Sequence, residues 1–113
     1  MNEQMRTDRE NQFEILKKVE QEAERFFEQR KTGKALPIWE RKPLRKIGEQ
    51  GLGAKDAMDL FIREYGEGLA LNSGPRFFGY VIGGVTPAAL AGDWLTSLYD
   101  QNAFGWQVSE FSL

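Results

Sequence analysis

The chain of 113 residues contains no cysteine and no histidine. Without cysteine it can form no disulfide, no thiolate nucleophile and no cysteine-based zinc site. Without histidine it lacks the side chain that most often serves as a general base and as a metal ligand. These two absences remove the commonest general base and the commonest metal ligand, and the expectation for this chain is no catalytic residue and no metal site.

The sequence also lacks a long hydrophobic run and a strong excess of charge of either sign. No stretch reaches the roughly 18 apolar residues that a membrane span needs, and the polar start MNEQMRTDRENQ contains no hydrophobic core of a signal peptide. The 15 basic and 17 acidic side chains give a net charge of −2, which provides no overall attraction to nucleic acid or anionic lipid. We expect a cytoplasmic protein with no membrane and no nucleic acid among its partners.

What the sequence does contain is the apolar spacing of amphipathic helices. A first helix is predicted over residues 8–30, with a capping box formed by Thr7 and Glu10 and with Gly33 at its end. A second is predicted over residues 55–70. The glycine-rich GEQGLGAK before it fits neither a dinucleotide fingerprint nor a phosphate loop, so it predicts a turn into the helix.

Residues 34–46 connect these two helices, and Pro37 and Pro43 keep most of them out of helix. Trp39 lies inside this connector. A large aromatic side chain on an irregular segment needs a surface to pack on. That surface can belong to another subunit.

The most distinctive stretch is GPRFFGYVIGGVTPAALAGDWL, residues 74–95. Its aromatic part favours extended backbone up to a glycine pair. Thr86 then predicts the cap of a third helix, residues 87–100, whose first turn begins with Pro87. Small residues make the first half of this helix slim, which suits close packing against another helix or an identical copy.

This run, with the preceding helix and the following FGWQVSEF, resembles the N-terminal region of the group II pyridoxal-phosphate-dependent amino-acid decarboxylases. That family includes the aromatic-amino-acid, histidine and glutamate decarboxylases. The shared pattern is a proline-aromatic-aromatic-Gly/Ala-Tyr segment, a small-residue loop, a proline-capped helix with Leu and an acid, and then Trp and Ser. The resemblance is specific over residues 74–109 and weak over residues 8–73. Gly74 stands where the family usually has histidine, and Glu110 stands where it has proline.

The resemblance implies a mainly α chain that belongs to a fold-type I homodimer. Residues 1–74 would form a helical dimerisation arm, and residues 75–113 would form an extended segment and the start of the large, pyridoxal-phosphate-binding domain, truncated. The parent enzyme would remove the α-carboxylate of an L-amino acid, with pyridoxal phosphate as its cofactor. No lysine follows Lys55, so the cofactor lysine would lie downstream. The chain by itself should bind no cofactor and be inactive. It is then either a piece of a longer enzyme or the product of a gene that encodes only the arm.

The resemblance also assigns residues to two roles by their place in the family's pattern. Residues expected to line the substrate pocket are Tyr80, Val81, Ile82, Gly83, Asn102 and Phe104. Residues expected to pack in the dimer are Trp39, Phe77, Phe78, Ala88, Ala91 and Trp94.

Two other classes of function stay open. The chain can be a stand-alone helical module for protein–protein interaction, without catalysis, in which the amphipathic helices dock a partner. A nucleic-acid binder has less support, because Arg76 beside Phe77 and Phe78 imitates a stacking platform but lacks a surrounding basic patch.

Overall fold

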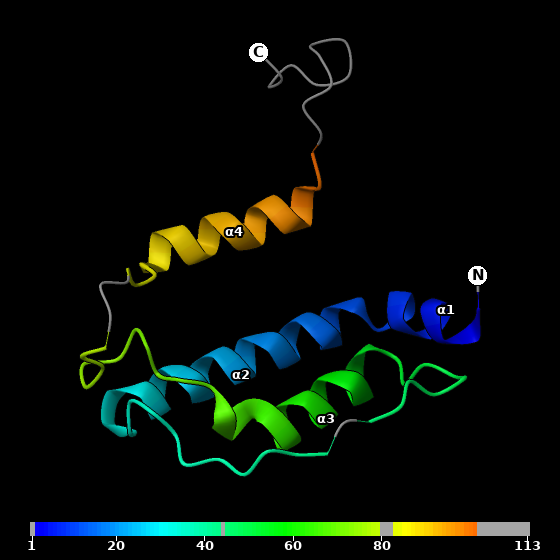
Figure 1. Ribbon diagram of the computed structural model, residues 1–113. Coiled ribbons are helices and arrows are strands. Elements are labelled where there is room, and N and C mark those ends of the chain that lie inside the picture. Colours follow the sequence, from blue (N-terminus) through cyan, green and yellow to red (C-terminus); the bar gives the residue numbers. More distant parts are fainter. Residues whose placement is uncertain (1, 44, 80–82, 102–113) are drawn as a thin grey trace. The chain divides into compact units, whose positions relative to one another are not determined.

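The computed structural model describes residues 2–43, 45–79 and 83–101, and these residues form helices and connecting segments without a strand (Figure 1). The helices in chain order are α1 (Glu3–Glu10), α2 (Gln12–Thr32), α3 (Ala54–Tyr65), the short 3-10 helix η1 (Gly66–Gly68) and α4 (Pro87–Tyr99). The chain divides into two compact units, Met1–Tyr80 and Val81–Leu113. The predicted mainly α class is confirmed in the described residues.

The first predicted helix is in fact two helices, α1 and α2. α1 begins at Glu3 because the side chain of Asn2 accepts a hydrogen bond from the Met5 N–H, at 2.9 Å. Thr7 therefore lies inside α1, and the predicted capping box is wrong. The two helices meet at Asn11, whose backbone N–H and side-chain amide both donate to the Thr7 carbonyl oxygen at 3.0 Å. Such local bonding by asparagine competes with helix continuation.

The end of α2 is covered by the segment that follows η1. Leu71 lies there with 4% of its surface exposed, and it is the one hydrophobic residue that is buried within the described ranges. Its N–H donates to the Ala35 carbonyl oxygen at 3.0 Å. Arg30 donates from Nη1 to Ser73 Oγ at 3.0 Å, and its guanidinium lies 4.6 Å from the centre of the Phe27 ring.

Glycine is required on both sides of this contact because there is no room for a side chain. Gly33 is the C-cap residue of α2, as predicted. A Cβ atom at Gly33 would lie 2.6 Å from both the Gln29 carbonyl oxygen and Leu71 Cδ1. A Cβ atom at Gly74 would lie 2.8 Å from the Arg30 carbonyl oxygen. The close approach of backbone to backbone therefore fixes where the segment crosses the helix end.

The start of α3 is fixed by α1, which lies more than forty residues earlier in the chain. The Ala54 N–H donates to both carboxylate oxygens of Asp8, at 3.0 Å each. The side-chain amide of Gln4 also donates to the Gly51 carbonyl oxygen. Gly53 has a φ of 77°, a backbone conformation that favours glycine. The predicted non-helical turn from GEQGLGAK into the helix is confirmed. The N-cap residue of α3, Gly53, has no side chain to accept a hydrogen bond, and Asp8 of α1 serves as the acceptor in its place.

In the second unit, α4 begins and ends as its sequence predicts. Thr86 Oγ1 accepts a hydrogen bond from the Ala89 N–H at 3.2 Å, and Pro87 occupies the first helical position. The helix ends at Asp100, whose φ of 46° is left-handed. No helix in the described part of the chain is both long enough and apolar enough to cross a bilayer.

Candidate interaction surfaces

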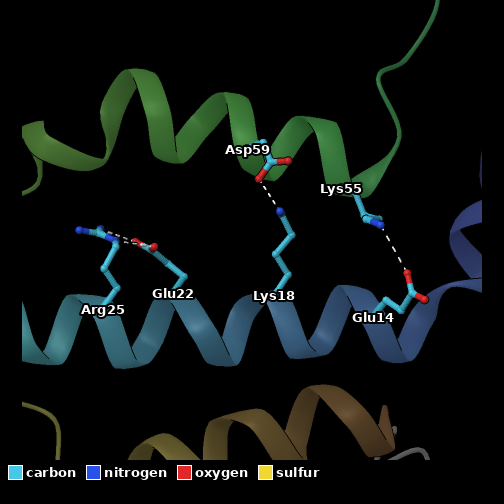
Figure 2. A network of polar contacts seen from close by, with 6 residues as sticks. All are labelled: Glu14, Lys18, Glu22, Arg25, Lys55 and Asp59. Atoms are coloured by element: carbon cyan, nitrogen blue, oxygen red, sulfur yellow. Dashed lines mark hydrogen bonds and ion pairs between the residues drawn. The ribbon is translucent and has the colours of Figure 1, made fainter.

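α2 and α3 are joined by ion pairs along one side (Figure 2). Lys18 Nζ of α2 lies 2.5 Å from Asp59 Oδ1 of α3. Lys55 Nζ of α3 lies 3.4 Å from Glu14 Oε2 of α2. Because these side chains are partly exposed to solvent, each pair contributes at most about 1 kcal/mol. These charges hold two helices together and leave little free charge on that side for a ligand.

Two arginines have a raised pKa because each donates hydrogen bonds to a carboxylate. The bond from Arg25 to Glu22, with 2.7 Å between Nε and Oε2, raises the pKa of the Arg25 guanidinium. The bonds from Arg45 to Glu64 raise the pKa of Arg45 in the same way. A raised pKa means that the stabilising contribution is complete below the usual arginine pKa and is lost only as the pH rises through the raised value. Neither arginine therefore loses its charge in the neutral pH range.

Trp39 packs on its own chain. Its indole N–H donates to the Glu64 carbonyl oxygen at 3.2 Å, and its ring lies 5.9 Å from the Tyr65 ring, measured between centroids. A Cβ atom on Gly68 would lie 2.8 Å from Trp39 Cδ2, so the ring sits directly on the backbone of η1. The surface that the sequence requires for this aromatic is thus available within the first unit, and a role in the dimer stays a prediction.

Of the six predicted substrate-pocket residues, the structure describes Gly83 alone. Tyr80, Val81, Ile82, Asn102 and Phe104 lie outside the described residues. Gly83 is described, is exposed and has no other atom within 4 Å of a Cβ built on it. The pocket assignment therefore stays a prediction.

The predicted packing residues besides Trp39 are mostly exposed. Phe78 is 92% exposed, whereas Phe77 is half-buried and lies against Gly79. On α4, Ala88 and Ala91 are exposed and Trp94 is 42% exposed. Such side chains leave apolar surface available for a partner.

A basic surface that the sequence reasoning missed lies on the connector between α2 and α3. We call residues 34–47 the strap; its described residues are 34–43 and 45–47. The strap contains five basic side chains and one acidic one, Glu40. Its aliphatic side chains Leu36, Ile38 and Ile47 are exposed. The signal is present in ERKPLRKI, but the net charge of −2 for the whole chain conceals it.

Two open grooves border α3. The larger, of ≈ 790 Å³, is lined by Arg45, Lys46, Ile47, Gly48, Gln50, Gly51, Leu52, Asp56, Asp59, Leu60 and Arg63. The smaller, of ≈ 470 Å³, lies between α1 and the start of α3 and is lined by Glu3, Gln4, Thr7, Asp8, Asn11, Leu52, Gly53, Lys55 and Asp56. The larger groove is lined by three basic and two acidic side chains, and the smaller by three acidic side chains and one basic. In the smaller groove one of the acids, Asp8, is already bonded to the Ala54 N–H.

The described residues do not fit pyridoxal phosphate or a metal. Six of the seven lysines are exposed, and the seventh, Lys18, is paired with Asp59. None of them combines burial with an unpaired amine, which a lysine that bonds covalently to a cofactor requires. Among the described residues no group of three or more acidic side chains is placed to hold a metal ion. We derive no catalytic step from this chain.

Comparison of the chain with protein-family models, with curated proteins and with solved structures gave no match. The resemblance to the decarboxylases over residues 74–109 therefore stays a prediction from the residues.

Proposed function

We propose that this chain is the N-terminal, dimer-forming portion of a pyridoxal-phosphate-dependent amino-acid decarboxylase and is inactive by itself. In this proposal the chain supplies shape and contacts, while a cofactor-binding portion elsewhere removes the α-carboxylate of an L-amino acid. The finer fold, a helical arm followed by the first helix of a fold-type I large domain, is part of the same proposal.

The observation that supports this proposal most is the distribution of apolar surface. Leu71 is the one hydrophobic residue buried within the described part of the chain, whereas fifteen large hydrophobic residues there are exposed. A chain that buries so little apolar surface gains little of the free energy that offsets the ordering of its backbone. Such a chain is expected to gain its stability by covering these side chains on a partner, as an arm does.

α4 supports the proposal in a second way. It is a well-capped helix, with Thr86 and Pro87 at its start, yet all of its side chains are exposed except the half-buried Leu90. Its mean hydropathy is the highest of the four helices. An apolar helix of this kind is suited to lie inside a larger domain, which agrees with the position that the resemblance gives it.

The proposal is tested with the product of the complete reading frame that contains this chain. We expect that product to show the visible absorption of lysine-bound pyridoxal phosphate, to lose that absorption irreversibly on borohydride reduction, and to release carbon dioxide from an L-amino acid. Tyr80→Phe and Asn102→Ala should raise KM for the amino acid without removing the cofactor absorption. A reading frame without a cofactor-binding lysine domain would refute the proposal.

The stand-alone interaction module is the second candidate, and the same exposed face of α4 favours it. The two functions differ in what the complete reading frame encodes. A module predicts a stable complex with another protein in the absence of any cofactor absorption.

A further inference from the structure

Charge is distributed between two separate surfaces of this chain. The strap, residues 34–47, has five basic side chains against one acidic. The part of the second unit that the structure describes, residues 83–101, has two acidic side chains, Asp93 and Asp100, and no basic one. The overall charge of −2 conceals this separation. Opposite charges on two exposed surfaces are the arrangement that steers the docking of one surface onto the other.

Most of the strap's charge is not used within its own unit. Arg45 is paired with Glu64. Lys34, Arg41, Lys42 and Lys46 are exposed, and none of them has an ion pair with a residue that the structure describes. Four cations in a segment without regular structure therefore remain available for an acidic partner.

The two acidic side chains in and directly after α4 are likewise free of ion pairs with described residues. Asp93 and Asp100 are exposed and have no hydrogen bond or ion pair with their side chains among the described residues. Asp93 lies within α4 and Asp100, seven residues later, is its C-cap residue, which places their Cα atoms about 10.5 Å apart along the helix axis. Trp94, which is 42% exposed, adjoins Asp93 on that helix.

The spacing of the strap's cations is compatible with that of the two carboxylates. Lys42 and Lys46 are four residues apart, and Pro43 between them disfavours helix. Four residues of extended chain span up to about 14 Å. Two flexible lysines at that separation can reach both Asp93 and Asp100, while exposed aliphatic side chains of the strap cover apolar surface of α4.

The strap's composition argues against nucleic acid as the occupant. Bases stack on exposed aromatic side chains. The strap's one aromatic, Trp39, is turned onto Gly68 and Tyr65 of its own unit. Its exposed apolar side chains, Leu36 and Ile38 among them, are aliphatic.

We propose that the basic strap of one copy of this chain docks on the acidic α4 unit of a second copy, through Lys42 and Lys46 against Asp93 and Asp100. The inference depends on the proposed dimeric function and names the surfaces that meet. The contact is reciprocal, because a two-fold axis places each strap on the α4 unit of the other copy.

Two variants with opposite changes test this contact. In the strap variant, Lys42→Glu and Lys46→Glu reverse the charge at the two contact positions, lower the net charge of the strap from +4 to 0, and leave the Arg45 pair intact. In the helix variant, Asp93→Lys and Asp100→Asn remove the acidic surface, and asparagine is chosen because it tolerates the left-handed backbone at position 100. A control, Lys17→Glu with Arg76→Glu, makes the same total change of charge as the strap variant at exposed positions outside both surfaces.

The readout is the dimer dissociation constant, measured by analytical ultracentrifugation, with helix content followed by circular dichroism. We expect the dimer dissociation constant of each variant alone to be at least about tenfold higher than that of the unmodified chain. An equimolar mixture of the two should recover dimerisation, because only the mixed dimer has opposite charges at both contacts. The unmodified dimer should weaken as salt is raised, and the control should dimerise like the unmodified chain.

Each other outcome overturns the inference. A chain that dimerises equally well with either variant uses different surfaces, and the proposed dimeric function survives that result. Variants that weaken the dimer but are not rescued by mixing indicate that strap and α4 meet within one copy or act indirectly. A monomeric chain whose strap binds phosphatidylserine vesicles or an oligonucleotide assigns the strap to another partner. The cofactor absorption of the complete reading-frame product is independent of all these results, so the two proposals can fail separately.

Discussion

The contact between Asp8 and the first amide of α3 makes the sharpest test of the described fold. The Ala54 N–H has no acceptor within its own helix, because the first N–H groups of a helix point outward. Both oxygens of Asp8 accept from it at 3.0 Å. Replacing Asp8 with alanine should therefore expose this amide, although the substitution lies in a different helix.

The expected magnitude follows from helix capping. Loss of a capping side chain costs about 1 kcal/mol, and loss of a negative charge at a helix start costs a further ~0.3–1 kcal/mol. The total of about 1–2 kcal/mol corresponds to roughly a 5- to 30-fold faster exchange of the Ala54 amide, because about 1.4 kcal/mol is a factor of ten. Asp8→Asn keeps an acceptor and should give an intermediate rate.

The assay is amide hydrogen exchange resolved by residue with NMR. Glu10→Ala is the matched control, since it removes one exposed acid of the same helix that makes no hydrogen bond to a described residue. The reasoning is refuted if Asp8→Ala changes the exchange of the Ala54 amide by less than twofold, or if Glu10→Ala accelerates it equally.

Three further predictions concern stability, measured by urea or thermal unfolding. Gly33→Ala should destabilise the protein by about 1–3 kcal/mol, because its new Cβ would lie 2.6 Å from Leu71 and from a backbone oxygen that cannot move away. Gly92→Ala should instead stabilise α4 by up to ~1 kcal/mol, because there is open space around Gly92. The opposite order of the two unfolding midpoints would contradict this reasoning. Trp39→Phe removes the hydrogen bond of the indole and should cost about 1 kcal/mol beyond any change in packing; an unchanged midpoint would show that the bond contributes nothing. Asp59→Asn should cost less than about 1 kcal/mol, and less again at high salt, because its ion pair is partly exposed; a larger, salt-independent loss would contradict that account.

The helices that depend on local signals could be predicted from the sequence. α4 carries its whole start signal in Thr86-Pro87, and the structure has both residues in the predicted roles. The turn before α3 is equally local, because Gly53 has a positive φ. Each of these two features is decided by the conformational preference of one or two residues, which the sequence displays directly. The end of α2 was also predicted at Gly33, but its φ of −67° suits any residue, and glycine is needed there because Leu71 and the Gln29 carbonyl leave no room for a side chain.

The features that could not be predicted depend on residues far apart in the chain. Asp8 caps a helix 46 residues away, and no local pattern announces such a partner. Trp39 packs on Gly68, where a side chain would collide with the indole ring. The sequence does not show this contact, because it depends on the three-dimensional path of the strap. The break at Asn11 could not be predicted because residues 6–12 contain no apolar side chain, so apolar spacing gives no signal there, and a single asparagine decides where the helix divides.

The position of α1 has a practical consequence for anyone handling this polypeptide. Proteolytic trimming of the first ten residues would remove Asp8 and Gln4 together, and with them the acceptor of the Ala54 amide and the amide donor to Gly51. The loss of these hydrogen bonds would loosen the first turn of α3, which lies more than forty residues from the cut. A preparation with a nicked N-terminus would therefore be expected to show a frayed internal helix, which is easily mistaken for an intrinsic weakness of that helix.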